Sequence, residues 1–429
     1  MSSLLPNRAL SQVTDSRGGG VDAETMAVAS AIVSQVEKGG VAALDSLTSQ
    51  FEERPDGLPL FLTRDDLQEA AGSIPGADLA RLRTTAGRIE RFALAQRRAL
   101  TSLDGVEVTG GRAGHTVVPV ERAGCYAPGG RYPLPSSVLM TAVTARAAGV
   151  SEVWVASPRP APITLAAAAV AGVDGMLVAG GAHAIAALAF GAGPLEPCDM
   201  VVGPGNRYVT AAKRIVFGRV GIDMLAGPSE LVVLADATAD PAVVAADLIA
   251  QAEHDPDALP ILITADHRLA DAVRAEVKAG LDSLPTAAIA RPALEAGAAI
   301  LVGDLDEAIA ACDAIAPEHL QLSLADAADV RSRLSNYGAV FVGEGSAEVF
   351  GDYGVGPNHV LPTGGTARFT GGLSVLSFLR VRTWLEIDST PELRAETAWL
   401  ARQEGLEGHA RAAEIRRQEQ EPGEGRNVG

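Results

Sequence analysis

Gln251 and His254 form the first pair whose types and spacing suggest a metal site. They lie in the segment QAEH, at the end of an apolar-periodic stretch and just before Pro256. Residues three apart share one face of a helix. A carbonyl oxygen beside an imidazole nitrogen can hold a metal of intermediate softness such as Zn²⁺. The alternative is a plain helix C-terminus whose histidine favours the helix dipole, and the spacing leaves both interpretations open.

Glu318 and His319, adjacent in APEHL, place two proton acceptors at one point of the chain. Both side-chain types act as general bases near neutral pH when their surroundings tune them. We predict that they lie in a loop set by Pro317. The alternative is an ordinary ion pair in a surface loop.

Two further segments combine glycines with potential ligands. Residues 351–362, GDYGVGPNHVLP, carry Asp352 and His359 among glycines that permit tight turns or a close approach to a ligand. Residues 404–409, EGLEGH, carry Glu404 and His409. Taken alone, the first segment is also compatible with a Gly-rich turn, and the histidine of the second with a solvated chain end.

Two Gly-rich loops could meet a phosphate group. AGCYAPGG, residues 123–130, precedes a helix expected from about Ser136, and VGPGN, residues 202–206, follows a strand and opens a helix. Backbone N–H groups bind phosphate in such a setting, although tight turns have the same composition. The GxGxxG, Walker A, HExxH and GxSxG motifs are absent.

Alternating strand-like and helix-like stretches position these segments, a pattern that favours parallel sheets covered by helices. We expect strands at 152–156, 175–178, 200–202, 230–234, 260–264, 299–302 and 339–342. Helices are expected at 22–36, 77–103 (capped by Asp78), 162–170, 183–190, 206–217, 241–253, 267–279, 305–315 and 392–417. The first hundred residues are expected to be helical, and residues 419–429 disordered. Two open α/β units follow, in which ligands bind outside the carboxyl ends of the strands.

Composition excludes several classes of function. The 429 residues include 53 acidic and 35 basic side chains, a formal charge of −18 that argues against nucleic-acid or anionic-membrane surfaces. The three cysteines form no CxxC pair, which disfavours disulfides and thiolate metal sites. No run of about 18 apolar residues predicts a membrane span. The first ten residues do not resemble a signal peptide, so a cytoplasmic enzyme is expected.

Taken together, these segments resemble the histidinol dehydrogenase family from about Gly105 to Arg416. The matching stretches occur in the family's order: CYAPGG, PLPSSVLM, AIAALAFG, VGPGN, DMLAGPSE, QAEHDPD, APEHL, GDYGVGPNHVLPTGG and EGLEGH. The resemblance implies an α/β fold with two open Rossmann-like parallel-sheet domains and a domain-swapped homodimer with shared active sites. The expected domains are residues 1–21, an N-terminal segment; 22–124 with 229–370, a first α/β domain with a helical shoulder; 125–228, a second; and 371–429, a C-terminal helical arm with a disordered tail.

The resemblance also implies roles for individual residues. It makes Glu318 and His319 the catalytic bases of a four-electron oxidation of L-histidinol to L-histidine through histidinal, with two NAD, in the last steps of histidine biosynthesis. It implies a zinc site of Gln251, His254, Asp352 and His409, with His409 supplied by the partner subunit. Substrate contacts would be these four ligands with Ser229, His319, Glu348, His359 and Glu404, and NAD contacts Tyr126, His183 and Asn206.

Two observations bear on alternatives to this function. His183 stands where the family motif GAQAIAAL has glutamine, which puts the cofactor contact there in question. Glu348 and Glu404 favour a cationic substrate over an anionic one, such as a sulfonated diol oxidised by a related dehydrogenase. A metal-dependent hydrolase would leave Tyr126 and Asn206 without a role. A non-catalytic, metal-stabilised dimer would leave the Glu318–His319 pair unexplained.

Overall fold

The computed structural model describes residues 3–16, 21–129 and 132–416. It divides into two compact units, Met1–Arg97 with Val120–Phe378 and Arg98–Pro119 with Leu379–Gly429. The chain is a mixed α/β protein with parallel sheets, as predicted. The predicted boundaries of the two α/β domains remain predictions, and the tail expected to be disordered, residues 419–429, lies outside the described residues.

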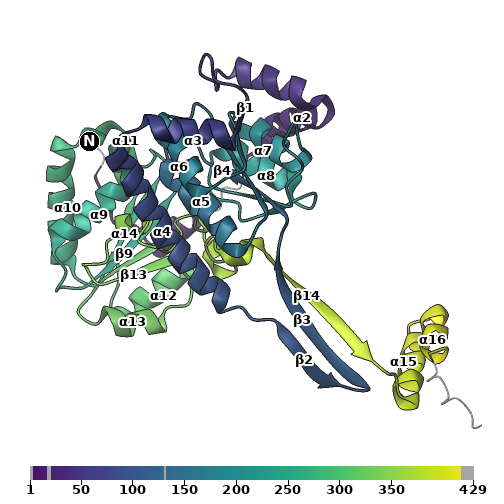
Figure 1. The fold of residues 1–429 in the computed structure, drawn as a ribbon. Helices are drawn as coiled ribbons and strands as arrows, with labels where there is room; N and C mark the ends of the chain where they lie inside the picture. Colours follow the sequence, from purple (N-terminus) through teal and green to yellow (C-terminus); the bar gives the residue numbers. More distant parts are fainter. Residues whose placement is uncertain (1–2, 17–20, 130–131, 417–429) are drawn as a thin grey trace, which may run out of the picture. The chain divides into compact units, whose positions relative to one another are not determined.

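A six-stranded sheet in the first unit has the order β1-β6-β5-β4-β7-β8, with only the edge strand β1 antiparallel (Figure 1). Its strands are β1 (Phe61–Thr63), β4 (Arg122–Tyr126), β5 (Glu152–Ala156), β6 (Gly175–Leu177), β7 (Met200–Val202) and β8 (Gly221–Ile222). The helices around it are α2 (Ala23–Gln50), α3 (Arg64–Ser73), α5 (Pro135–Ala148), α6 (Pro162–Ala171), α7 (Gly181–Phe190) and α8 (Arg207–Val216). The long helix α4 (Gly76–Arg98) instead contacts residues 354–356.

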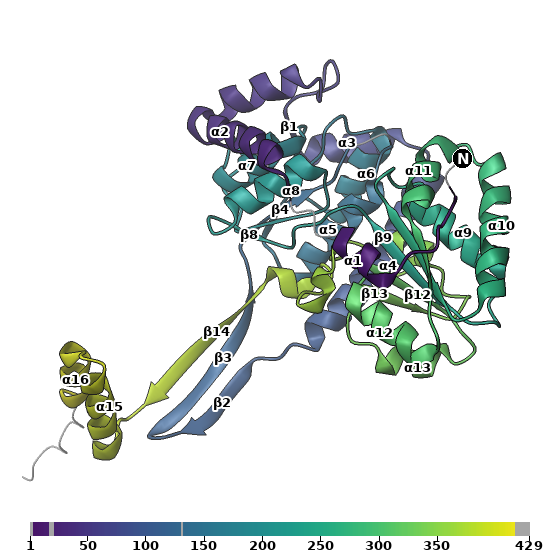
Figure 2. The ribbon, with the colours of Figure 1, turned by 180° about the vertical axis from the view of Figure 1, so that it is seen from behind.

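The strand order explains how helices cover both faces of this sheet. The chain runs outward from β4 to β6, then returns past β4 to β7. Because parallel crossovers are right-handed, this reversal moves the connecting helices to the other face. Accordingly α5 packs on α6, whereas α7 packs on α8, and α2 lies beside both α7 and α8 (Figures 1 and 2). Helices α6 and α7 are Ala-rich and almost wholly buried, so the layers approach closely.

A five-stranded, all-parallel sheet in the same unit has the order β11-β10-β9-β12-β13. Its strands are β9 (Glu230–Ala235), β10 (Leu259–Thr264), β11 (Ala298–Leu301), β12 (His319–Ser323) and β13 (Ala339–Val342). The accompanying helices are α1 (Leu10–Ser16), α9 (Pro241–Ala252), α10 (His267–Ser283), α11 (Ala287–Ala296), α12 (Leu305–Ile315), α13 (Ala327–Arg333) and α14 (Glu348–Asp352), followed by the 3₁₀ turns η1 (Thr366–Arg368) and η2 (Val375–Phe378). One apolar cluster involves α9–α11 and another α12–α13, so both faces of the sheet are buried, as its unbroken apolar strands require.

The second unit contains a three-stranded antiparallel sheet, β14-β3-β2, and two helices. Its elements are β2 (Leu103–Val108), β3 (Gly111–Pro119), β14 (Leu379–Ile387), α15 (Pro391–Gln403) and α16 (Glu407–Glu414). No helix among the described residues is both long and apolar enough to cross a membrane.

Some expected elements differ from the structure. The helix expected to end at Leu103 ends at Arg98, and Asp78 lies in its first turn instead of capping it. Residues 61–63 form a strand within the stretch expected to be helical. His319 begins β12 and so lies in the sheet, not in a loop. His254 follows α9, which ends at Ala252, although its N–H still donates to the Gln251 carbonyl.

A buried ion pair fixes the loop after β7. The Lys213 ammonium is paired with the Asp223 carboxylate, and both side chains are almost completely buried. Lys213 also donates to the Gly203 carbonyl at 3.0 Å, and Asp223 accepts the Gly203 N–H at 2.8 Å. Gly203 has φ +119°, and a Cβ there would lie 2.1 Å from the Tyr126 carbonyl oxygen. The Gly203 N–H is therefore used internally, which disfavours the phosphate interpretation of this loop.

Replacing Lys213 with methionine should lower the free energy of unfolding by about 3–5 kcal/mol, because it leaves a buried carboxylate unpaired. Urea unfolding at an unchanged slope would measure the loss. Arg81→Met, which removes an exposed ion pair with Asp78, is the matched control and should change the midpoint little. Equal midpoints for both variants would contradict this role for Lys213.

Candidate active site

The short helix α14 brings two of the predicted site carboxylates together. Glu348 and Asp352 are its first and last residues, four apart, so they share a face of the helical turn. Both are buried, with 2% and 7% of their surface exposed. His319, Glu348 and Asp352 each offer one potential ligand atom, and these three atoms lie within 4.8 Å of one another. The segment therefore forms a structured acidic turn. The spacing of its two carboxylates, and not its glycines, indicates the site.

The Asp352 carboxylate faces three imidazoles. Its oxygens lie 3.6 Å from His254 Nε2, 3.8 Å from His319 Nε2 and 4.0 Å from His359 Nδ1. These separations are too long for hydrogen bonds. Two ligands of a tetrahedral zinc ion lie about 3.4 Å apart, given metal–ligand distances near 2.1 Å. The His254–Asp352 separation is therefore compatible with an ion between the two groups.

Gln251 supplies the clearest sign that the site is built for a ligand. It is completely buried, yet neither its amide oxygen nor its amide nitrogen has a hydrogen-bond partner among the described residues. Both carboxylate oxygens of Glu348 are likewise buried and unpartnered. Each such group costs about 1–3 kcal/mol when left unsatisfied. Such a cost is expected where an ion or substrate completes the bonding.

His319 is held in one tautomer. Its Nδ1 lies 3.2 Å from the Glu230 carbonyl oxygen, an acceptor, so Nδ1 carries the proton and donates it. Nε2 then presents its lone pair towards Asp352. Burial lowers the pKa of the imidazole to about 4, although the Asp352 charge opposes the shift. His319 is therefore neutral at physiological pH and able to accept a proton at Nε2.

Glu318 is fixed by the same neighbouring strand. Its Oε2 accepts the Glu230 N–H at 2.9 Å, and the side chain is 6% exposed. Burial raises the pKa of its carboxyl well above the usual range, with a smaller lowering by the Glu230 N–H. Glu348 shows the same upward shift in pKa, again from burial, strengthened by the Asp352 and Glu318 charges. Carboxyls poised in this way exchange protons nearer to neutral pH.

His359, another predicted substrate residue of the first unit, also contacts this cluster. Its Nδ1 lies 2.8 Å from the Asp352 carbonyl, which leaves Nε2 as the acceptor. Ser229 directly precedes β9 and Glu230, and its carbonyl accepts the Leu259 N–H at 2.9 Å. Ser229 thus lies next in sequence to the residue that anchors Glu318 and His319.

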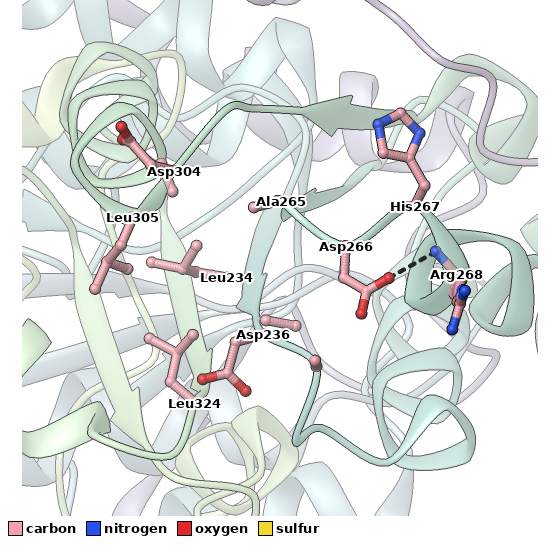
Figure 3. A pocket seen from close by; sticks show the side chains of 12 residues that line it. Leu234, Asp236, Ala265, Asp266, His267, Arg268, Asp304, Leu305 and Leu324 are labelled. Carbon is pink, nitrogen blue, oxygen red and sulfur yellow. Dashed lines mark hydrogen bonds between the residues drawn. The ribbon is translucent and has the colours of Figure 1, made fainter.

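The catalytic candidates lie at the amino ends of strands, which corrects the expectation for this sheet. Glu230 and His319 are the first residues of β9 and β12. The carboxyl ends of β9 and β10 instead border a cavity of about 470 Å³ (Figure 3). There Asp266 accepts the Arg268 N–H and caps α10, and Asp304 caps α12. These carboxylates serve the local backbone, and the catalytic candidates do not line the cavity.

The predicted cofactor residues lie at the carboxyl ends of the six-stranded sheet. Tyr126 ends β4, and its hydroxyl accepts the Gly181 N–H at 3.1 Å. His183 lies in the first turn of α7, almost completely buried, with Nε2 2.8 Å from a Glu53 carboxylate oxygen. Asn206 caps α8 by accepting the Tyr208 and Val209 N–H groups. Sequence reasoning identified these three residues but missed Glu53, which lies 130 positions from His183.

Glu404 and His409 belong to the second unit. Glu404 directly follows α15, His409 lies in α16, and both residues are exposed.

Comparisons with known proteins show which family the chain belongs to. The family model for histidinol dehydrogenase matches residues 16–417. Histidinol dehydrogenases from Thermus thermophilus and Methylococcus capsulatus are 46% and 43% identical, over 94% and 90% of this chain and 97% and 90% of theirs. The crystal structure of histidinol dehydrogenase from Elizabethkingia anophelis superposes with a TM-score of 0.88 at 32% identity, covering 97% of this chain and 98% of that one. The chain therefore belongs to the histidinol dehydrogenase family of NAD-dependent oxidoreductases.

Proposed function

We propose that this protein oxidises L-histidinol to L-histidine through histidinal, in two NAD-dependent steps at one site, as the last steps of histidine biosynthesis in the cytoplasm. The observation that carries the proposal is the neutral imidazole of His319 beside the buried carboxyl of Glu318. Both are held by the backbone of one residue, Glu230, through its carbonyl and its N–H. A proton acceptor and a carboxyl that can activate water are the two groups that a four-electron oxidation of an alcohol requires.

In this proposal Gln251, His254 and Asp352 hold a zinc ion, with His409 supplied by a second copy of the chain. The unpartnered amide of Gln251 and the 3.6 Å separation of His254 from Asp352 fit such an ion. Zinc would supply a grip on the nitrogens of the substrate. The oxygen and nitrogen donor set contains no thiolate, and the three cysteines are buried and free.

NAD would supply the hydride acceptor for both oxidations. We assign its binding to Tyr126, His183 and Asn206. The fit rests on His183, whose Nδ1 is buried and has no partner among the described residues. A donor group of the cofactor would satisfy this atom.

His319 accepts the hydroxyl proton of the alcohol at Nε2 during the first oxidation, which produces the aldehyde. Glu318 then takes a proton from a water molecule as the water adds to the aldehyde carbon. His319 accepts the next hydroxyl proton in the second oxidation, which produces the carboxylate. Retaining the aldehyde between the steps prevents its loss to side reactions.

Glu348, and Glu404 from a second copy, favour a substrate that carries a cationic amino group. The pKa of Glu348 is raised because its carboxyl is buried with other acidic groups nearby. A cation bound there would lower that pKa again and stabilise the ionised form. Ser229 and His359 would complete the contacts to the substrate, alongside the metal ligands and His319.

The second unit supports the proposal of a homodimer. It leaves many large apolar side chains exposed, among them Val381, Leu385, Trp399, Leu400 and Ile415, each at least 55% exposed. Large apolar side chains exposed in this number on one small unit favour burial against a partner. A second copy that covered it would bring Glu404 and His409 to a neighbouring active site.

Complete conversion of L-histidinol by the zinc-loaded protein should yield two NADH for each molecule consumed, with histidine as the product. Absorbance and amino-acid analysis of the same sample would measure both quantities. One NADH and free histidinal would contradict the two-step proposal. NAD binding without any turnover of histidinol would instead indicate a different alcohol substrate.

Glu318→Gln should slow the oxidation of added histidinal by about 10²–10⁴-fold, because the water-activating carboxylate is lost. The oxidation of histidinol to trapped histidinal should fall much less, because His319 is unchanged. Stopped-flow measurement of NADH for each half-reaction would separate the two effects. Glu121→Gln, at an exposed carboxyl, is the control. Equal losses in both half-reactions would contradict a specific role for Glu318 in activating water.

Shared sites can be tested by mixing Glu318→Gln and His409→Ala, two variants expected to lack the complete conversion of histidinol to histidine, under conditions that exchange subunits, with histidine formation as the measured activity. A mixed dimer would contain one intact site, built from the intact core of one subunit and the intact His409 of the other. Random mixing of a two-fold dimer should restore about a quarter of the wild-type activity. An absence of recovery despite confirmed exchange would place His409 in the site of its own chain.

A further inference from the structure

The segment that follows α2 reaches the start of α7. Helices α2 and α7 lie side by side in both views (Figures 1 and 2). Phe51 directly follows α2, and its ring stacks on the His183 imidazole with centroids 5.5 Å apart and planes 20° apart. Glu53, two residues later, points its carboxylate at the first turn of α7. A segment far away in the sequence therefore surrounds the histidine that replaces the family's glutamine.

The contacts of Glu53 determine where His183 carries its proton. Glu53 Oε2 accepts the Gly180 N–H at 2.6 Å and lies 2.8 Å from His183 Nε2. An ionised carboxylate only accepts hydrogen bonds, so His183 Nε2 must donate. In the neutral ring, Nδ1 is then an acceptor. This atom is buried and has no hydrogen-bond partner among the described residues.

The backbone around Glu53 is firmly held. Its N–H donates to the Thr48 carbonyl at 3.0 Å, and its carbonyl accepts the Arg159 N–H at 2.6 Å. The residues Glu52 and Arg159 both have positive φ, +52° and +44°, which is uncommon for residues other than glycine. Backbone strain of this kind persists where surrounding contacts over-determine the conformation, and such places cluster at functional sites.

Gly180 makes room for this arrangement. A Cβ at that position would lie 2.8 Å from Glu53 Oε1 and 2.6 Å from the Pro158 ring. Only glycine therefore lets the carboxylate approach the start of α7 so closely. The two first N–H groups of this region, those of Gly180 and Gly181, are taken by Glu53 and Tyr126. These two N–H groups are thus already used, and the buried Nδ1 of His183 is the acceptor left without a partner among the described residues.

We propose that Glu53 is a positioning residue for NAD: it fixes the Nε2-protonated tautomer of His183, so that Nδ1 accepts a hydrogen bond from a hydroxyl or amino group of the cofactor. The inference rests on the proposed contact between His183 and NAD. A glutamine carries a donor and an acceptor on one amide and needs no such partner, whereas a neutral histidine has one of each, assigned by its neighbours. Glu53 supplies that assignment in this chain.

The test is a double-mutant cycle on the full-length, zinc-loaded protein. In Glu53→Met no oxygen accepts from His183 Nε2, so the ring proton is no longer fixed there and Nδ1 is no longer held as an acceptor. We expect the KM and the Kd for NAD to rise about tenfold, as for one lost hydrogen bond, with kcat at saturating NAD changed less than about twofold. In the His183→Gln background, Glu53→Met should change neither constant by more than about twofold. Glu52→Met, at the exposed neighbouring side chain, is the matched control.

Equal effects of Glu53→Met in both backgrounds would overturn the proposal, because Glu53 would then act independently of His183. An unchanged Kd in the single variant would overturn it as well. Wild-type protein that failed to bind NAD would refute the proposed function together with this inference. Wild-type protein that bound NAD normally while Glu53→Met had no effect would refute the inference alone.

Two further measurements test the tautomer of His183 and identify the donor group of the cofactor. ¹⁵N resonances of histidine-labelled wild-type protein, assigned by comparison with His183→Gln, should show an unprotonated Nδ1, and a protonated Nδ1 would overturn the proposal. Nicotinamide hypoxanthine dinucleotide lacks the adenine amino group. An effect of Glu53→Met that persists with this analogue assigns the donor to a hydroxyl or the carboxamide, and a lost effect assigns it to the adenine.

Discussion

Removal of water from Glu318, His319 and Glu348 is the constraint on which the chemistry depends. Burial disfavours the charged form of each group, so the imidazole stays neutral and the carboxyls hold their protons more tightly. The same burial leaves Gln251 and Glu348 with unpartnered polar atoms. The free-energy cost of these groups must be offset by the rest of the fold. An all-parallel sheet buried on both faces provides the necessary apolar contacts.

Much of the fold could be predicted from apolar runs. EVWVA predicts β5 with the observed bounds, because a strand buried on both faces is apolar throughout. Strand β12, HLQLS, was missed although its alternation of polar and apolar residues is typical of a strand, because Pro317 favoured a loop at Glu318 and His319. Strands β2, β3 and β14 were missed because they bury little apolar surface: β2 and β14 are mostly exposed, and β3 is mostly half-buried.

The site could be predicted from the sequence only where the residue types themselves suggest a chemical role. The i, i+4 spacing of Glu348 and Asp352 indicates a shared helical face, but the glycines around Asp352 obscured the helix. The anchoring of Glu318 and His319 by Glu230 uses the backbone, which any residue type supplies, so no sequence signal marked it. Glu53 and His183 meet only because α2 packs against α7, a tertiary contact that local patterns do not encode. The roles assigned to these residues came from the resemblance to the family.

The helix pair α15–α16 has a consequence for how the protein is made. Its buried cluster consists of three alanines, Ala398, Ala401 and Ala410, whereas Trp399 and Ile415 remain 63% and 79% exposed. Alanine buries little apolar area, so this core contributes little to stability. If a second copy covers this pair, as proposed, the folding of the pair is coupled to assembly. Chains that have not yet assembled would then expose this apolar surface to proteases and aggregation. The concentration of chains available for assembly would then limit how much active enzyme accumulates.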